Sequence, residues 1–190
     1  MTRPIPFIRS IASVTALAAL GAAAGSVPAA EGSDAPVAHW EQRTLDYTYM
    51  GFTTHYSCDG LEDNVRELLL ALGARKKDLE IHSVGCTRLV GIEPFPGVKA
   101  HFWVLVPGPG DAKTTVQATK WQSVNLVRQI DFRTDQGQCE LLDQLKHKAL
   151  PLFTSRNLDF HSSCVPHEIT LGDIHFTVEV LRPAGAKPPA

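Results

Sequence analysis

The chain has 190 residues, with 18 Lys or Arg against 20 Asp or Glu, so its formal net charge is −2. This mild acidity argues against nucleic acid or an anionic membrane as a partner, because either would need a basic surface. Four cysteines, an even number, favour disulfides formed in an oxidising compartment.

The first 29 residues have the order of a secretory signal peptide. Arg3 and Arg9 give a basic start, residues 11–24 are apolar, and small residues follow in GSVPAAEGS (25–33). An apolar run of this length is shorter than the roughly 20 residues that span a bilayer. We therefore expect cleavage after Ala29 and a soluble periplasmic or secreted protein. Removing Arg3 and Arg9 takes its formal charge from −2 to −4.

The mature chain has the size of a single domain, which we expect at 39–184 between a flexible N-terminus (30–38) and a flexible tail (185–190). A first strand is expected at TLDYTYMGFTTHY (44–56), which is rich in Thr and aromatic residues. A helix should start at Cys58 with Asp59 at its dipole-favoured end and stop at Gly73. Its apolar face comprises Leu61, Val65, Leu68, Leu69 and Leu72.

The basic cluster ARKK (74–77) is expected to contact the carboxyl end of that helix. Extended segments follow at 79–84 and 101–107, and PGPGDAK (107–113) is a turn-rich connector.

The second half offers a similar series of elements. VNLVRQIDF (124–132) reads as a strand that alternates Val124, Leu126, Ile130 and Phe132. A helix should start at Cys139, with Glu140 near its start and Pro151 ending or kinking it. Its face comprises Leu142, Lys146, Ala149, Leu150 and Phe153, and extended segments follow at 158–162 and 175–183.

An internal repeat connects the two halves. Trp40 precedes Cys58 by 18 residues, as Trp121 precedes Cys139, and EIHSVGC (80–86) resembles DFHSSC (159–164). We expect a tandem β-α-β-β unit: repeat one at 40–107, a connector at 108–120 and repeat two at 121–183. The predicted fold is a two-layer α+β domain of six strands, with both helices over the sheet and one shared core.

The repeat predicts the disulfides Cys58–Cys86 and Cys139–Cys164. The strands before and after each helix should run parallel, and as neighbours they would bring the two cysteines within bonding range.

Histidines near the cysteines leave an alternative open. His55 and His82 in the first half, and His161 and His167 in the second, together with the cysteines could bind zinc or copper. The oxidising compartment opposes this, because bound cysteines must be reduced. We therefore expect no metal and no cofactor, and keep a metal-handling protein as the alternative function.

An enzyme is less expected than a binding protein. Ser83, Ser162 and Ser163 lie near His but lack a nucleophile elbow, so a small hydrolase is a distant third reading.

A protein partner, or self-association, has one candidate surface. Phe102, Val104 and Val106, like Phe176, Val178 and Val180, should face the core. The opposite side of the first half then presents His101, Trp103 and Leu105 as a possible partner surface, unless the connector or the tail covers it.

The segments YSCDGLEDNVRELLLALGAR (56–75), GCTR (85–88), CELLDQLKHKALPLF (139–153) and CVPH (164–167) resemble a group of exported proteobacterial proteins with no assigned activity. The resemblance implies a periplasmic or secreted setting and carries no functional residue. The predicted function is an exported, disulfide-stabilised binding or accessory module.

Overall fold

The computed structural model describes residues 34–52, 54–87, 91–111, 115–129, 138–163, 165 and 174–186. The predicted signal peptide lies outside the described residues. Residues 33–190 form one compact unit. In the part of the chain that is described, no helix is long and apolar enough to cross a membrane.

The strands form two antiparallel sheets of three strands each. The first contains β1 (Ala38–Thr48), β2 (Glu80–Val84) and β3 (Gly97–Pro107) in the order β1-β3-β2. The second contains β4 (Thr119–Asn125), β5 (Ser155–Ser162) and β6 (Ile174–Pro183) in the order β4-β6-β5. The α+β class is confirmed, although two sheets are present where we expected one. In each half the last strand is central.

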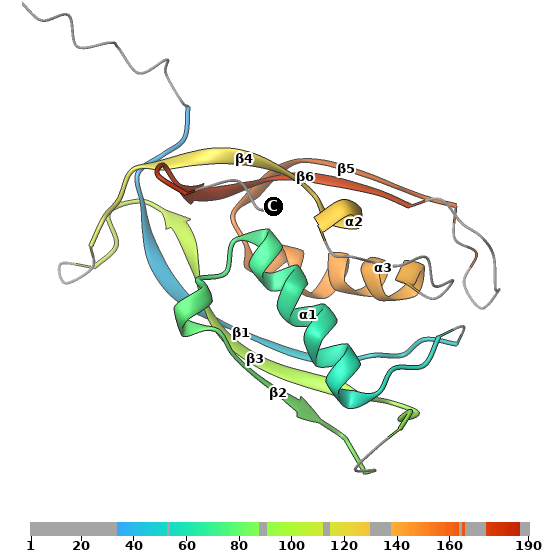
Figure 1. The fold of residues 1–190 in the computed structure, drawn as a ribbon. Coiled ribbons are helices and arrows are strands. Elements are labelled where there is room, and N and C mark those ends of the chain that lie inside the picture. Colours follow the sequence, from blue (N-terminus) through green and yellow to red (C-terminus); the bar gives the residue numbers. More distant parts are fainter. Residues whose placement is uncertain are drawn as a thin grey trace, which may run out of the picture. The chain divides into compact units, whose positions relative to one another are not determined.

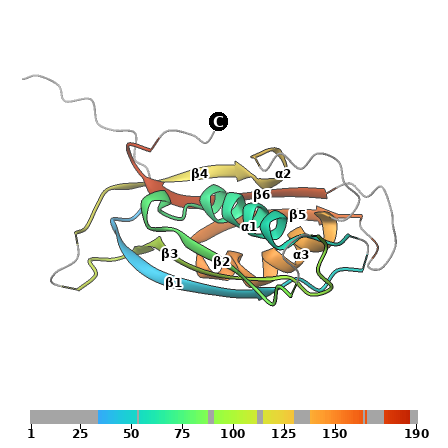
Figure 2. The ribbon, with the colours of Figure 1, turned by 60° about the horizontal axis from the view of Figure 1, so that its bottom comes forward.

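The two longer helices, α1 (Cys58–Leu72) and α3 (Gln138–Lys148), lie between the two sheets (Figures 1 and 2). α1 and the short η1 (Lys76–Asp78) connect β1 to β2. α2 (Leu126–Gln129), α3 and η2 (Leu150–Leu152) connect β4 to β5. One apolar core therefore receives side chains from both sheets and both longer helices.

α1 begins and ends as its sequence predicts. The Ser57 hydroxyl caps the first turn by accepting from the Gly60 N–H (3.1 Å), and Gly73 ends the helix at a φ of 109°. All five residues of the predicted apolar face are at most 2% exposed. The basic residues of ARKK do not cap the last turn. Arg182 of β6 does so, donating to the carbonyl oxygens of Leu70 (3.2 Å) and Ala71.

The central strands also face the core as predicted. Phe102, Val104, Phe176, Val178 and Val180 are at most 1% exposed, and Val106 is partly buried against them. The Phe102 ring stacks on that of Phe153 from the second half, with centroids 5.4 Å apart.

The predicted bounds of two strands were wrong, because β1 starts at Ala38 rather than Thr44 and β4 starts at Thr119 rather than Val124. β1 ends at Thr48 because it follows β3 residue by residue, from Ala38↔Pro107 to Thr48↔Gly97. β4 ends at Asn125, opposite Thr177, and the chain then turns into α2, which buries Leu126. The length of the partner strand therefore overrode the local β propensity. Ile130 and Phe132 lie outside the described residues.

Candidate functional site

The predicted disulfide between Cys58 and Cys86 is present, with the Cα atoms 6.3 Å apart. The expected strand adjacency is wrong, because β1 and β2 flank β3 and so lie about 10 Å apart, two strand spacings. The cysteines meet because the segment after β1 approaches the β2–β3 loop, where Ser57 bridges Ile92. α1 then begins beside β2, and the Ser83 hydroxyl donates to the carbonyl oxygen of Cys58 (3.3 Å).

In the second half, Cys139 is also disulfide-bonded. Its predicted partner, Cys164, lies outside the described residues. The pairing Cys139–Cys164 therefore stays a prediction.

Two loops meet at the Cys58–Cys86 bond, residues 49–57 and residues 85–96. The Tyr49 N–H donates to the Pro96 carbonyl (2.9 Å), and the Glu93 N–H donates to the Tyr56 carbonyl (3.2 Å). Glu93 is only 2% exposed, and its carboxylate accepts from the backbone N–H (2.9 Å) and the hydroxyl (3.0 Å) of Thr87. A buried carboxylate must keep such donors, so these bonds hold Thr87 and Glu93 together.

Five exposed apolar side chains belong to these two loops and the end of β2. We call Met50, Phe52, Val84, Ile92 and Phe95 the apolar tip; their exposed fractions run from 36% for Val84 to 69% for Phe52. The sequence reasoning missed this surface. Its signal was available, because MGF (50–52) and EPFPG (93–97) place large apolar residues between turn residues.

α3 of the second half holds the loop that carries Met50 and Phe52. The Gln144 side chain accepts from the Met50 N–H (3.2 Å) and donates to the Met50 carbonyl (2.9 Å). Glu140 accepts from the Phe52 N–H (2.9 Å) and the Tyr49 hydroxyl (3.3 Å). Burial, with a neighbouring tyrosine and Glu140, raises the pKa of Tyr49. Hydrogen bonds from the second half therefore hold the part of the apolar tip that carries Met50 and Phe52.

The alternative metal site is only partly described. His55 and His82 are exposed, and His167 lies outside the described residues. Cys58 and Cys86 form a disulfide, so neither offers the thiolate that the mixed site requires. Among the described residues, no three His, Cys, Asp or Glu side chains are arranged around a common point as a metal site would be.

A different histidine pair lies on the second sheet, where His161 of β5 is directly opposite His175 of β6. The Asp159 carboxylate bridges them: Oδ1 is 2.9 Å from Nε2 of His161, and Oδ2 is 3.1 Å from Nε2 of His175. The two imidazoles border an open hollow of about 360 Å³, which is also lined by Ser162, Ser163 and Ile174. Asp159 was not singled out from the sequence, because only the register brings it between the histidines.

The proposed surface of His101, Trp103 and Leu105 requires a correction. Leu105 is 2% exposed and packs with Ala38 and Leu181, so it offers no area to a partner. The reason is that the ends of β1, β3 and β6 converge there. His101 and Trp103 are half-buried.

Arginines cover the neighbouring tryptophans. The Arg75 guanidinium carbon lies 5.0 Å from the Trp103 ring centroid and 4.9 Å from that of Trp40. In the second half, Arg156 lies 4.3 Å from the Trp121 ring centroid. Arg156 and Trp121 follow Arg75 and Trp40 by the same 81 residues. Cation–π contacts of this kind stabilise a sheet face and leave less of it open to a partner.

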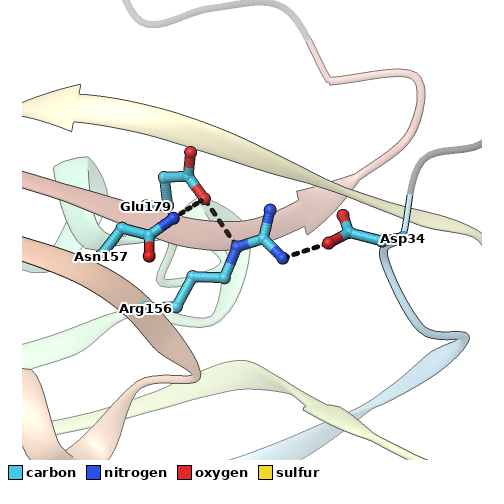
Figure 3. Close-up of polar contacts among 4 residues, drawn as sticks. All are labelled: Asp34, Arg156, Asn157 and Glu179. Atoms are coloured by element: carbon cyan, nitrogen blue, oxygen red, sulfur yellow. Dashed lines mark hydrogen bonds and ion pairs between the residues drawn. The ribbon is translucent and has the colours of Figure 1, made fainter.

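Arg156 also anchors the start of the folded unit (Figure 3). Its Nε lies 2.6 Å from Glu179 Oε2, and its Nη1 lies 2.5 Å from Asp34 Oδ2. The hydrogen bond from Arg156 lowers the pKa of Asp34. Ala38 adds paired backbone hydrogen bonds with Gln117 (3.1 and 2.9 Å). Residues 34–38, which the sequence analysis placed in a flexible segment, are thus held at both ends.

No family model, curated protein or solved structure matches the chain. The resemblance to exported proteobacterial proteins rests on the sequence motifs alone.

Proposed function

We propose that the protein is an exported, non-catalytic binding module that uses the apolar tip to hold an extended, apolar segment of another exported protein. One observation carries the proposal: five exposed apolar side chains belong to two loops and an edge strand that a disulfide and backbone hydrogen bonds join. Exposed apolar clusters mark interaction sites, and a frame that is already ordered loses little entropy on binding.

The disulfide supports the export part of the proposal, because such bonds persist in oxidising compartments. Protein recovered from the periplasm or the medium should have an intact mass that places its N-terminus at Ala30. A full-length chain confined to the cytoplasm contradicts export without bearing on the tip.

The neighbouring strand indicates the form of the partner. β2 is an edge strand of its sheet and ends at Val84, within the tip. An extended segment that adds to this edge makes main-chain hydrogen bonds and directs alternate side chains toward the tip. Asp59 and Asp63, both exposed, lie in the first turns of α1 beside the disulfide. Their charge favours Lys or Arg in the bound segment.

A linear peptide library displayed on phage tests this chemistry against the purified mature protein. Enriched peptides should carry apolar residues at alternate positions and at least one Lys or Arg. Their affinity should fall about tenfold or more in Phe52→Gln and Phe95→Gln, since exposed aromatic anchors carry much of such binding.

Leu158→Gln is the matched control, because Leu158 is a large apolar residue, 47% exposed, on the second sheet. It should bind the peptides as the wild type does. Enrichment of peptides that bind the tip variants equally well contradicts the proposal. A wild-type dimer in sedimentation that Phe95→Gln dissociates also contradicts it, because the apolar tip would then bind a second copy of the chain. Binding to lipid vesicles that depends on the apolar tip contradicts it as well, because the ligand would then be lipid.

A further inference from the structure

We propose that His161, His175 and Asp159 form a surface site for a divalent transition-metal ion, Zn²⁺ or Cu²⁺, on the outer face of the second sheet. This donor set is independent of the apolar tip, and it contains neither the cysteines nor His55, His82 or His167.

A bulge in β5 brings the three side chains to one face. Arg156 pairs with Glu179, but Asp159 pairs with Thr177, so β5 contains one more residue than β6 across this interval. Asn157 takes up the left-handed conformation there, with a φ of 51°, which Asn tolerates better than most residues. Without the extra residue, the alternation would turn Asp159 and His161 toward the core.

The core-facing side of β5 and β6 fixes this register. Phe160 is directly opposite Phe176, and their rings pack edge to face with centroids 5.2 Å apart on the core side. Phe176 is 1% exposed, so this pair anchors both strands where the histidines project outward. The backbone that carries the three donors is therefore set by core packing.

The spacing of the strands allows the three donors to reach one ion once their side chains rotate. Directly opposite side chains have Cβ atoms about 4.5–5.5 Å apart, close enough for two imidazoles to bind one ion. Ligand atoms about 2.0–2.2 Å from a tetrahedral ion lie roughly 3.4 Å from each other. The carboxylate oxygens lie 2.9 and 3.1 Å from the two Nε2 atoms.

At present the carboxylate lies between the imidazoles and hydrogen-bonds to both, so the three donors do not surround a common point. The side chains of His161, Asp159 and His175 are 81%, 56% and 47% exposed, so they can rotate without disturbing the core. Two imidazoles and a carboxylate are ligands that Zn²⁺ and Cu²⁺ accept. They leave a position open on a tetrahedral ion beside the hollow.

Calorimetric titration of ZnCl₂ into the tag-free, oxidised mature protein tests the site. We expect one Zn²⁺ per chain, and His161→Gln, His175→Gln and Asp159→Asn should each weaken binding about tenfold or more. Cu²⁺ should bind more tightly than Zn²⁺, and its electron paramagnetic resonance spectrum should show coordination by two imidazole nitrogens.

His82→Gln is the matched control, because His82 is also an exposed strand histidine but lies opposite Lys99. It should bind Zn²⁺ as the wild type does. Because the substituted side chains are exposed, all variants should melt at the same temperature without metal. The proposal is overturned if the wild type binds no stoichiometric Zn²⁺, or if the His161→Gln, His175→Gln double variant still binds it normally.

Discussion

Asp34 and Arg156 are 122 residues apart in sequence, yet their side chains form an ion pair. The corresponding arginine of the first half, Arg75, instead forms an ion pair close in sequence, with Asp78 three residues away. Both arginines thus lie over tryptophan rings, but Arg75 pairs with a nearby residue and Arg156 pairs with a residue distant in sequence. The positive charge of Arg156 should therefore shift the pKa of Asp34, and a titration of Asp34 should detect this shift.

The pKa of Asp34 should lie below the ordinary value of about 3.9 and return toward it in Arg156→Gln. Because the folded-state pKa is lowered, the pair contributes stability above the ordinary value and loses it as the pH falls through the folded pKa. Carbon NMR of the Asp34 carboxyl group measures both values.

Arg43→Gln is the control, because Arg43 pairs with Glu41 on the first sheet and should leave the Asp34 titration unchanged. Asp34 is exposed, so salt should reduce the shift. An ordinary pKa for Asp34 in the wild type at low salt contradicts the pairing.

At the scale of elements, α1 is joined to the first sheet by covalent and polar contacts at its start. Cys58 is bonded to Cys86, and the Ser83 hydroxyl donates to Glu62 (2.8 Å) as well as to the Cys58 carbonyl. At its other end, Arg182 donates to the carbonyl oxygens of Leu70 and Ala71 in the last turn, and burial lowers the pKa of that arginine. Both ends of α1 therefore depend on segments distant in sequence.

Replacing both Cys58 and Cys86 by Ala should lower the free energy of unfolding by about 3–4 kcal/mol, because the bond closes a long loop in the unfolded chain. Urea denaturation under non-reducing conditions measures this. The double variant should also expose residues 85–96 to proteolysis first.

Peptide mapping without reduction provides the check on connectivity, and we expect Cys58–Cys86 and Cys139–Cys164. A peptide linking Cys58 to Cys139 contradicts the structure. A double variant as stable as the wild type would mean that the hydrogen bonds around Glu93 hold the loop alone.

At the scale of the whole molecule, the two halves share one core. Phe102 stacks on Phe153, and the hydroxyl of Tyr47 donates to Gln144 of α3 (3.1 Å). In the described part of the chain, each half contributes one sheet and one longer helix, and a unit of about 70 residues with so small a core is marginal alone. The halves should therefore unfold together.

Leu68→Ala in α1 and Leu145→Ala in α3 should each lower stability by about 2–5 kcal/mol, since both side chains are at most 1% exposed. In each variant one transition should report on both halves. Tryptophan fluorescence in a Trp121→Phe background follows the first sheet alone, and in a Trp40→Phe, Trp103→Phe background it follows the second. Two separate midpoints, with only the mutated half shifted, would show that the halves are independent domains.

Local patterns were sufficient where a residue acts within its own element. The helical spacing of Leu61, Val65 and Leu68 defined the buried face of α1, and Gly73 marked its end. The alternation of Phe102 and Val104 defined the inner face of β3. The cysteine pairing was also correct for Cys58 and Cys86, although the expected strand adjacency was not.

The candidate sites could be predicted only in part, because their residues meet through pairing between elements. His161 was singled out, but its neighbours Asp159 and His175 follow from a bulge that no local pattern reveals. Leu105 has the alternation of an outward residue and is nevertheless buried, because the ends of three strands converge over it. The apolar tip appears only when two loops are joined by the bond between Cys58 and Cys86.

The sequence by itself determined the α+β class, the cysteine pairing in the first half and the inward faces of α1, β3 and β6, because helical and strand periods are properties of a single segment. The tertiary structure decided the division into two sheets, the ends of β1 and β4, which loops the disulfide joins, and which side chains meet on β5–β6. These depend on the length and register of partner strands, and a one-residue shift in register reverses the face of every side chain that follows.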